Sequence, residues 1–266
     1  MPAFKITLAY DGTDYVGWQR QASGASVQGL LEDALREFGD GDVAVAGAGR
    51  TDAGVHAIAQ VASFSLVRAM PADAVLRALN AKLPDAIRVM TAAEVPASFH
   101  ARFDARAKTY CYRMCNRDVM PPFERRYVWH VPGPLDVAAM QRAAKLLEGE
   151  HDFAAFQSAG SDVATTIRRV SSSAIGNPQS AIGNQSAIRD PQSTILEYHV
   201  TADGFLRHMV RAIVGSLVDV GRGRERPEWM AHVLESRDRS TAGPTAPAHG
   251  LFLVSVDYPA ALAAEP

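Results

Sequence analysis

The stretch Gly47-Ala48-Gly49-Arg50-Thr51-Asp52-Ala53-Gly54-Val55-His56-Ala57 concentrates glycines and reactive side chains in eleven consecutive positions. It follows an apolar segment, residues 43–46, and precedes a segment around Phe64 in which apolar and polar residues alternate. Glycine lets the backbone adopt positive φ or approach a ligand closely. We therefore predict a loop held by rigid elements, with the Asp52 carboxylate available for chemistry. An Asx-turn is the structural alternative for an isolated Asp-Ala-Gly.

The chain on both sides of this loop alternates between strand and helix patterns. Apolar residues at every second position predict a strand over 4–10. Apolar residues at helical spacing predict a helix that follows Ser26, a suitable N-cap. A further strand is expected around Phe64, and a helix over 71–83 with Pro71 at its first position.

The remainder of the chain repeats this order. We predict a strand over 110–114, a helix from Asp136, a shorter helix from Pro227 and a closing strand over 251–258. The longest apolar stripe predicts a helix over 206–221, on which Arg207 and Arg211 share one face. Two similar halves, 1–105 and 106–266, give an α+β protein with a mixed or antiparallel sheet.

Residues 173–193 stand apart because the triplet Ser-Ala-Ile recurs at 173, 180 and 186. The units between these triplets are rich in Asn, Gln and Pro and cannot bury a core. We predict that this segment is a lengthened, disordered surface loop joining two strands.

The charge balance excludes one class of function and favours another. The 266 residues carry 27 Lys and Arg against 29 Asp and Glu, so the net charge of −2 excludes a uniformly basic binder. Two segments nevertheless are basic: residues 99–130 (seven basic against three acidic, +4) and residues 204–226 (five against two, +3). Both interleave aromatic residues with cations, the mixture that base stacking and phosphate neutralisation require.

The cellular setting follows from what the sequence contains. No apolar run approaches the ~20 residues that span a bilayer, and the first residues lack the pattern of a signal peptide, so we expect a cytoplasmic protein without a membrane partner. Cys111 and Cys115 are four residues apart in a predicted strand, about 13 Å, which is too far for a disulfide. No thiols or histidines occur at zinc-finger spacing, so we expect no metal site.

Several motifs, taken together in their order along the chain, resemble the TruA family of tRNA pseudouridine synthases. These are Tyr10-Asp11-Gly12-Thr13, Gly17-Trp18-Gln19-Arg20-Gln21, Val27-Gln28, residues 49–57, Phe99-His100-Ala101-Arg102, Tyr110, Met209-Val210-Arg211 and residues 246–251. The resemblance implies the pseudouridine synthase fold, in which two α+β halves flank an RNA-binding cleft. It also implies a homodimer without cofactor or metal that isomerises uridine to pseudouridine at positions 38, 39 and 40 of the tRNA anticodon stem-loop.

The same resemblance assigns roles to four residues. Asp52 corresponds to the catalytic aspartate and Arg211 to its basic partner. Tyr110 corresponds to the ring that stacks on the target base, and Arg50 to a residue that helps to flip the target nucleotide. The chain departs from the family pattern at residues 205–209, Phe-Leu-Arg-His-Met, where relatives more often have Tyr-Asn before Met-Val-Arg.

Two other functions compete with this interpretation. A metal-dependent hydrolase would use Asp52, His56 and His100 as ligands, since carboxylate and imidazole suit zinc or iron. A non-catalytic RNA-binding module would leave Asp52 with a structural role only. Measurement of bound metal distinguishes the hydrolase from a pseudouridine synthase, and a turnover assay distinguishes the non-catalytic module from an enzyme.

Overall fold

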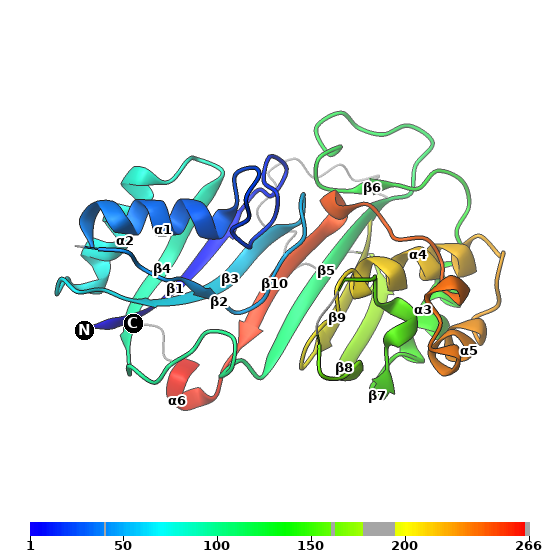
Figure 1. Ribbon diagram of the computed structural model, residues 1–266. Helices are drawn as coiled ribbons and strands as arrows, with labels where there is room; N and C mark the ends of the chain where they lie inside the picture. Colours follow the sequence, from blue (N-terminus) through cyan, green and yellow to red (C-terminus); the bar gives the residue numbers. More distant parts are fainter. Residues whose placement is uncertain (40, 161–162, 178–194, 264–266) are drawn as a thin grey trace. The chain divides into compact units, whose positions relative to one another are not determined.

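The computed structural model describes residues 1–39, 41–160, 163–177 and 195–263 (Figure 1). The chain forms two compact units, unit 1 (Met1–Lys108 with Phe252–Pro266) and unit 2 (Thr109–Leu251). The sequence division at 105/106 assigned residues 252–266 to the second half. In the structure they belong to unit 1, because β10 (Leu251–Asp257) pairs in parallel with β3 (His56–Ser65), Phe252 opposite His56.

Unit 1 contains a mixed sheet of strand order β4-β1-β3-β10. The predicted first strand is β1 (Ala3–Tyr10), and it pairs antiparallel with both β3 and β4 (Ile87–Val95). The short β2 (Ala46–Gly47) pairs with the opposite edge of β3 along part of its length, just before the Asp52 loop. β1 alternates as predicted at Phe4, Ile6 and Leu8, which are fully buried.

The helices of unit 1 are α1 (Val27–Phe38), α2 (Ala72–Lys82) and the short α6 (Ala260–Ala263). α1 and α2 lie side by side over the sheet (Figure 1). The predicted N-cap of α1 is confirmed: Ser26 Oγ accepts a hydrogen bond from the Gly29 amide at 3.2 Å. Pro71 caps α2 through its backbone alone, and the helix buries Val75 and Leu79 against the core.

In unit 2 the strand order is β5-β9-β8-β7, with β6 parallel to β5. Its strands are β5 (Ala107–Cys115), which begins at the division between the units, β6 (Trp129–His130), β7 (Gly149–Asp152), β8 (Ile167–Gly176) and β9 (Ile195–Ala202). Its helices are α3 (Val137–Lys145), α4 (Met209–Gly221) and α5 (Trp229–Ser236). α3 packs on β8 and α4. The predicted α+β class with a mixed sheet is confirmed.

Part of the predicted loop over 173–193 is strand. Residues 173–176 complete β8 and pair antiparallel with residues 197–200 of β9. Ser173 and Ile175 face inward and are buried, so the strand is specified by two alternate positions that the small, polar repeat obscures. Residues 178–193 of that prediction lie outside the described residues.

The longest helix is shorter at its N-terminus than its apolar stripe indicates. α4 begins at Met209 because His208 adopts a left-handed conformation, φ 62°. Arg207 therefore precedes the helix, and the prediction that it shares a helix face with Arg211 is wrong. Its guanidinium instead donates to the Ala159 carbonyl, with 3.0 Å between Nη1 and O. Among the described residues, no helix combines the length and the apolar character needed to cross a membrane.

Candidate active site

The loop that carries Asp52 is fixed on both sides by contacts within unit 1. The Tyr10 hydroxyl at the end of β1 shares a hydrogen bond of 2.8 Å with Thr51 Oγ1. Gln60 Nε2 from β3 donates to the Gly49 carbonyl at 3.0 Å, and the Trp18 amide donates to the Thr51 carbonyl at 3.0 Å. Asp52 itself is half-buried. The residues around it are thus held rigid while its carboxylate keeps access to solvent.

Burial shifts the pKa of the supporting tyrosine further above neutral pH. It raises the pKa of Tyr10 to about 12, and the hydrogen bonds with Thr51 and Gln60 oppose the shift. The phenol is neutral near pH 7, so its hydroxyl can both donate and accept a hydrogen bond. Its role is to position Thr51.

Two glycines before α1 let the chain approach this loop closely. A Cβ atom on Gly12 would lie 2.0 Å from the Val55 carbonyl oxygen, and one on Gly17 would lie 2.6 Å from that of Thr51. Gly17 also has φ +106°, which disfavours other residues. The Gly12 amide donates to His56 Nδ1 at 3.0 Å. The sequence singled out these glycines as motif members without a role; the structure shows that they pack on the reactive loop.

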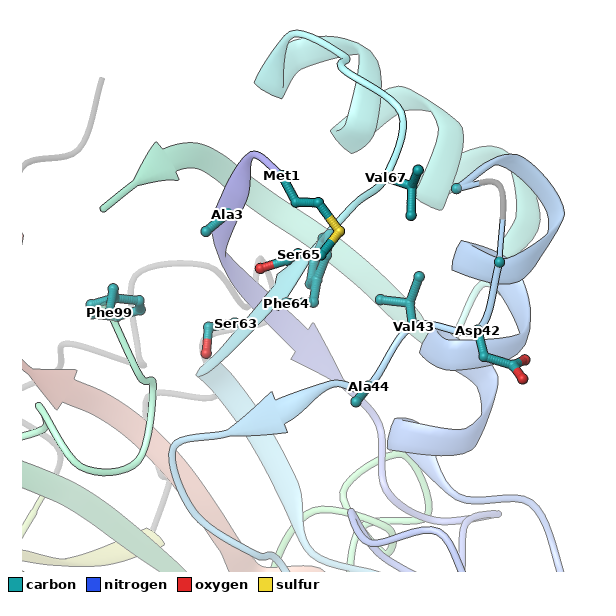
Figure 2. Close-up of a pocket in the computed structure, with 12 residues that line it drawn as sticks. Met1, Ala3, Asp42, Val43, Ala44, Ser63, Phe64, Ser65, Val67 and Phe99 are labelled. Atoms are coloured by element: carbon teal, nitrogen blue, oxygen red, sulfur yellow. The ribbon is translucent and has the colours of Figure 1, made fainter. Parts of the chain in front are cut away.

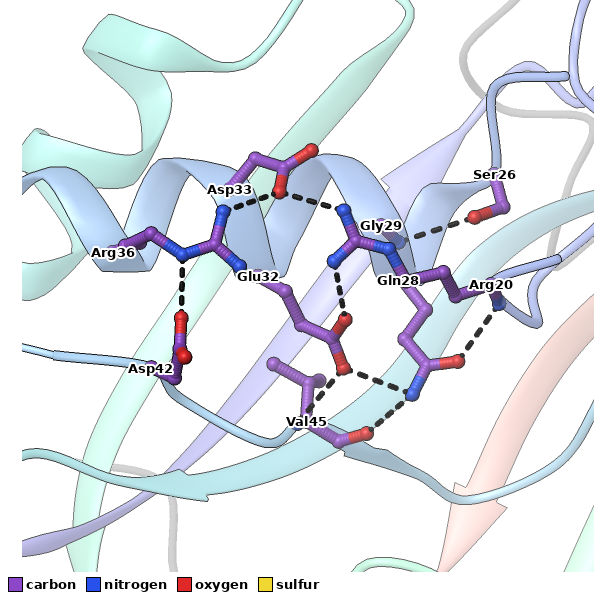
Figure 3. A network of polar contacts seen from close by, with 9 residues as sticks. All are labelled: Arg20, Ser26, Gln28, Gly29, Glu32, Asp33, Arg36, Asp42 and Val45. Carbon is purple, nitrogen blue, oxygen red and sulfur yellow. Dashed lines mark hydrogen bonds and ion pairs between the residues drawn. The ribbon is translucent and has the colours of Figure 1, made fainter. Parts of the chain in front are cut away.

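A polar network anchors the start of the loop to α1 (Figure 3). Gln28 Nε2 donates to the Val45 carbonyl at 3.0 Å, and Gln28 Oε1 accepts from the Arg20 amide at 3.0 Å. Gln28 Nε2 also donates to Glu32 Oε1 at 3.1 Å. Val45 directly precedes β2, which leads into the loop, so Gln28 links the helix to the segment that presents Asp52. This gives Val27-Gln28, a weak motif by itself, a defined structural role.

Arg50 and Asp52 share this loop, and Arg50 is exposed. An exposed guanidinium two residues from a half-buried carboxylate can reach an anionic ligand that binds over the loop. In unit 1 the structure thus brings two of the four candidate residues together on one rigid segment.

In unit 2, the other two candidates lie on β5 and α4. Tyr110 is buried on β5, and its ring meets that of Phe205 edge to face, with 5.0 Å between centroids. Arg211 is half-buried in the first turn of α4, where Nε donates to the Ala246 carbonyl at 2.8 Å. The Ala246 amide donates in return to the Arg211 carbonyl at 3.0 Å.

The segment opposite Arg211, residues 243–247, is held at both ends. The Gly243 amide donates to Ser216 Oγ of α4 at 2.9 Å, and the Tyr112 hydroxyl of β5 donates to the Pro247 carbonyl at 2.8 Å. A Cβ atom on Gly215 would lie 1.7 Å from the Pro244 carbonyl oxygen, so the segment packs directly on the helix backbone. This packing positions the Ala246 carbonyl that accepts the hydrogen bond from Arg211 Nε.

The positive charge of Arg211 affects the pKa values of two neighbouring groups. Burial raises the pKa of Tyr112, and Arg211 opposes that shift. Burial lowers the pKa of His249, Arg211 lowers it further, and the hydrogen bond to the Val128 carbonyl acts in the opposite direction. His249 is therefore favoured in its neutral form.

The residues of the hydrolase alternative have other partners. His56 Nδ1 accepts from the Gly12 amide, and His100 Nδ1 accepts from the Arg102 amide at 3.1 Å. Within the described ranges, Asp52, His56 and His100 do not gather into a ligand set.

A pocket of about 330 Å³ in unit 1 is lined mainly by small and apolar residues, among them Val43, Ser63 and Phe99 (Figure 2). None of the candidate residues Asp52, Arg50, Tyr110 and Arg211 lines it.

Sequence reasoning missed the residues that support the loop. Tyr10 and Trp18 belong to the family motifs, but nothing in the sequence indicated which atoms they contact. Gln60 gave no signal at all, because it lies in an alternating strand pattern where a polar residue is ordinarily exposed, whereas it is fully buried.

Comparison with known proteins agrees with this arrangement. The family model described as tRNA pseudouridine synthase matches residues 6–104 and 143–259. The chain is 44% identical over 258 residues to tRNA pseudouridine synthase A of Pelobacter propionicus, covering 97% of this chain and 100% of the relative. It is 46% identical over 260 residues to the protein of that name from Moorella thermoacetica, with the same coverage. The chain therefore belongs to the tRNA pseudouridine synthase family.

Proposed function

We propose that this chain isomerises uridine to pseudouridine at positions 38, 39 and 40 of the tRNA anticodon stem-loop, with Asp52 as the catalytic residue. The observation that carries the proposal is the Asp52 loop, which lies inside the matched family segment and is fixed by Tyr10 and Gln60 around one half-buried carboxylate. The hydrolase leaves the basic, aromatic segments unexplained, and the non-catalytic module leaves the fixed Asp52 carboxylate unexplained.

The chemistry requires few groups. The bond between uracil N1 and C1′ breaks, the base rotates, and C5 bonds to C1′; the proton leaves C5 and N1 gains one, so the product is an isomer. One carboxylate can start this sequence either by attacking the sugar or by removing a proton from it. The target nucleotide must leave the base stack to reach that carboxylate. No electron transfer occurs, so the reaction needs no redox cofactor.

Three further residues complete the proposal. Tyr110 stacks on the target base, and the edge-to-face contact with Phe205 helps to orient its ring for that role. Arg211 is the basic partner that keeps the reacting carboxylate charged once the base covers it. Arg50, exposed on the Asp52 loop, helps to hold the nucleotide flipped out. The basic segments 99–130 and 204–226 supply contacts to phosphates. We further propose that the protein acts in the cytoplasm as a homodimer without a cofactor.

The test is the position of the product. Purified full-length protein is incubated with unmodified tRNA transcripts that carry uridine at 38, 39 or 40, and pseudouridine is mapped by carbodiimide labelling and primer extension. We expect pseudouridine at these positions and at no other, and none in matched transcripts with cytidine there. Dialysis against EDTA should leave the yield unchanged. Absence of product, or product elsewhere in the tRNA, would contradict the proposal.

A further inference from the structure

Alternate residues of β5 and β9 in unit 2 form a ladder of cross-strand pairs. Thr109 Oγ1 and Thr201 Oγ1 share a hydrogen bond of 2.9 Å, and Arg113 Nε lies 3.3 Å from Glu197 Oε1. Residue numbers rise along β5 as they fall along β9, so the two strands are antiparallel. Cys111 lies midway between Thr109 and Arg113, on the same face of the strand. Tyr110, proposed to stack on the base, points to the opposite face.

Cys111 meets two ligand-bearing side chains of β9 on this face. Its Sγ, a carboxylate oxygen of Glu197 and a ring nitrogen of His199 lie within 4.8 Å of one another. Cys111 and Glu197 are buried, whereas 36% of the His199 side chain is exposed. The three groups therefore form a cluster that is closed on one side and reaches solvent through the imidazole.

The distances within the cluster suit a common ion. His199 Nε2 and Glu197 Oε2 are 3.1 Å apart. Two ligand atoms bonded at about 2.0–2.1 Å to a tetrahedral zinc ion lie roughly 3.4 Å apart, so a small rotation of either side chain would bring both into coordination. Without an ion, the same separation is that of a hydrogen bond from the imidazole to the carboxylate.

One oxygen of the Glu197 carboxylate is ion-paired with Arg113 but lacks a hydrogen bond. Glu197 Oε1 is buried, and it forms no hydrogen bond with any described residue. The residue is only 2% exposed, so water does not readily replace such a bond. A buried carboxylate oxygen without hydrogen bonds is unfavourable. The neighbouring Arg113 Nε likewise forms no hydrogen bond, although it is close enough to pair with the charge.

We propose that Cys111, Glu197 and His199 bind a zinc ion that links β5 to β9. A thiolate, an imidazole and a carboxylate are the ligands that zinc accepts together, whereas magnesium and calcium prefer oxygen alone. Three protein ligands leave the fourth position open on the exposed side of His199. The guanidinium of Arg113 remains beside the carboxylate as an outer-shell partner. Sequence spacing gave no hint of this set, because two separate strands supply it.

Ion binding requires the thiolate. Burial raises the pKa of the Cys111 thiol; the charge of Glu197 adds to the shift and that of Arg113 opposes it. The metal-free protein therefore holds the thiol proton. As the metal–sulfur bond forms, this proton passes to solvent.

Cobalt serves as the spectroscopic probe of the site. Full-length protein is dialysed against EDTA under reducing conditions and titrated with Co²⁺, whose bond to thiolate gives a near-ultraviolet charge-transfer band. We expect one Co²⁺ per chain, displaced by Zn²⁺. The Cys115→Ser variant is the matched control, because Cys115 is a second buried thiol on the same strand. It should keep the band, and Cys111→Ser should lose it.

A second variant tests the site in case Cys111→Ser does not fold. His199→Gln changes the half-exposed member of the cluster, so its melting temperature without metal should match that of wild type. Its affinity for zinc should fall at least tenfold, and zinc should no longer raise its melting temperature as it does for wild type. Failure of wild type to bind Co²⁺ or Zn²⁺ saturably, or a thiolate band that survives in Cys111→Ser, would overturn the proposal. Neither readout depends on pseudouridine formation.

Discussion

Tyr10 shows how a single hydroxyl supports the reactive loop. Tyr10→Phe removes the hydrogen bond to Thr51 and leaves the buried threonine hydroxyl with one partner fewer. We expect the free energy of unfolding to fall by about 1 kcal/mol. We expect single-turnover pseudouridine formation to slow by about tenfold, because the neighbouring Asp52 loses its fixed position.

Tyr198→Phe is the matched control for that change. Tyr198 is also fully buried, and its hydroxyl shares a hydrogen bond of 2.9 Å with Ser173 Oγ in unit 2. Urea unfolding should show a similar loss of stability, whereas turnover should stay at the wild-type value. A Tyr10→Phe variant that is destabilised but fully active would show that the hydrogen bond supports the fold only.

Arg211 is expected to be nearly as important for turnover as Asp52. Arg211→Ala removes the cation that we propose keeps the desolvated carboxylate ionised. Arg211→Lys should retain part of the activity, because it keeps the charge but loses the planar fork. Single-turnover rates at saturating protein separate this effect from binding.

The exposed Arg125 provides the comparison for Arg211. Arg125→Ala should mainly weaken tRNA binding and flatten its dependence on salt, with little change in the saturated rate. Wild-type single-turnover rates in Arg211→Ala would show that the role inferred for this residue is wrong. Arg207 is a poor replacement, because it lies outside α4.

The contact between α4 and residues 243–247 depends on Ser216. Its hydroxyl donates to the Ala212 carbonyl and accepts from the Gly243 amide, both at 2.9 Å and fully buried. Ser216→Ala leaves the Gly243 amide without this partner. We expect a loss of about 1–3 kcal/mol in the free energy of unfolding, and slower turnover as the segment that holds Arg211 loosens.

Ser236→Ala tests whether the effect is specific to this contact. Ser236 Oγ of α5 also donates within its helix, to the Val233 carbonyl at 2.7 Å, but the residue is only half-buried, so water can take its place. Thermal unfolding should show a smaller loss, and turnover should be unchanged. Equal effects of the two substitutions on turnover would contradict the proposed link from Ser216 to Arg211.

Much of the secondary structure was predictable because the apolar period is a local signal. β1, α1 and α2 follow their patterns closely, and Ser26 caps α1 as expected. The start of α4 was not predictable, since the left-handed backbone of His208 has no signature in an apolar stripe. The strand over residues 173–176 was not predictable, because pairing with β9 rather than composition specifies it.

The candidate site was predictable only in part for the same reason. Asp52, Arg50, Tyr110 and Arg211 were found through motifs, which name residues but not contacts. The support of Asp52 depends on the pairing of β1 with β3, which sets Leu8 opposite Gln60 and so brings Tyr10 and Gln60 to the loop. Such long-range register is not visible in a single sequence.

The stability of the whole protein should depend on pH through His249. Because burial and Arg211 lower its pKa in the folded state, the unfolded chain binds this proton more readily. The contribution of His249 to the free energy of unfolding is therefore fully present above the unfolded pKa of ~6.5. It is lost as the pH falls through the folded pKa. His249→Gln can still donate to the Val128 carbonyl, so it should reduce this dependence.

Urea unfolding at pH 7.5 and 5.5 measures the effect. His232→Gln changes an exposed histidine and serves as the control, which should keep the wild-type difference between the two pH values. If His249→Gln shows the full wild-type difference, another group is responsible for the loss of stability at low pH.

The role of Asp52 can be measured most directly by separating chemistry from binding. Wild type and Asp52→Asn are compared in single-turnover pseudouridine formation at saturating protein, with tRNA affinity measured in parallel at the same ionic strength. We expect the Asn variant to bind tRNA within a few-fold of wild type, because one half-buried carboxylate contributes few phosphate contacts. We expect it to form no detectable pseudouridine, because the reacting group is gone. Appreciable turnover by Asp52→Asn would contradict the account.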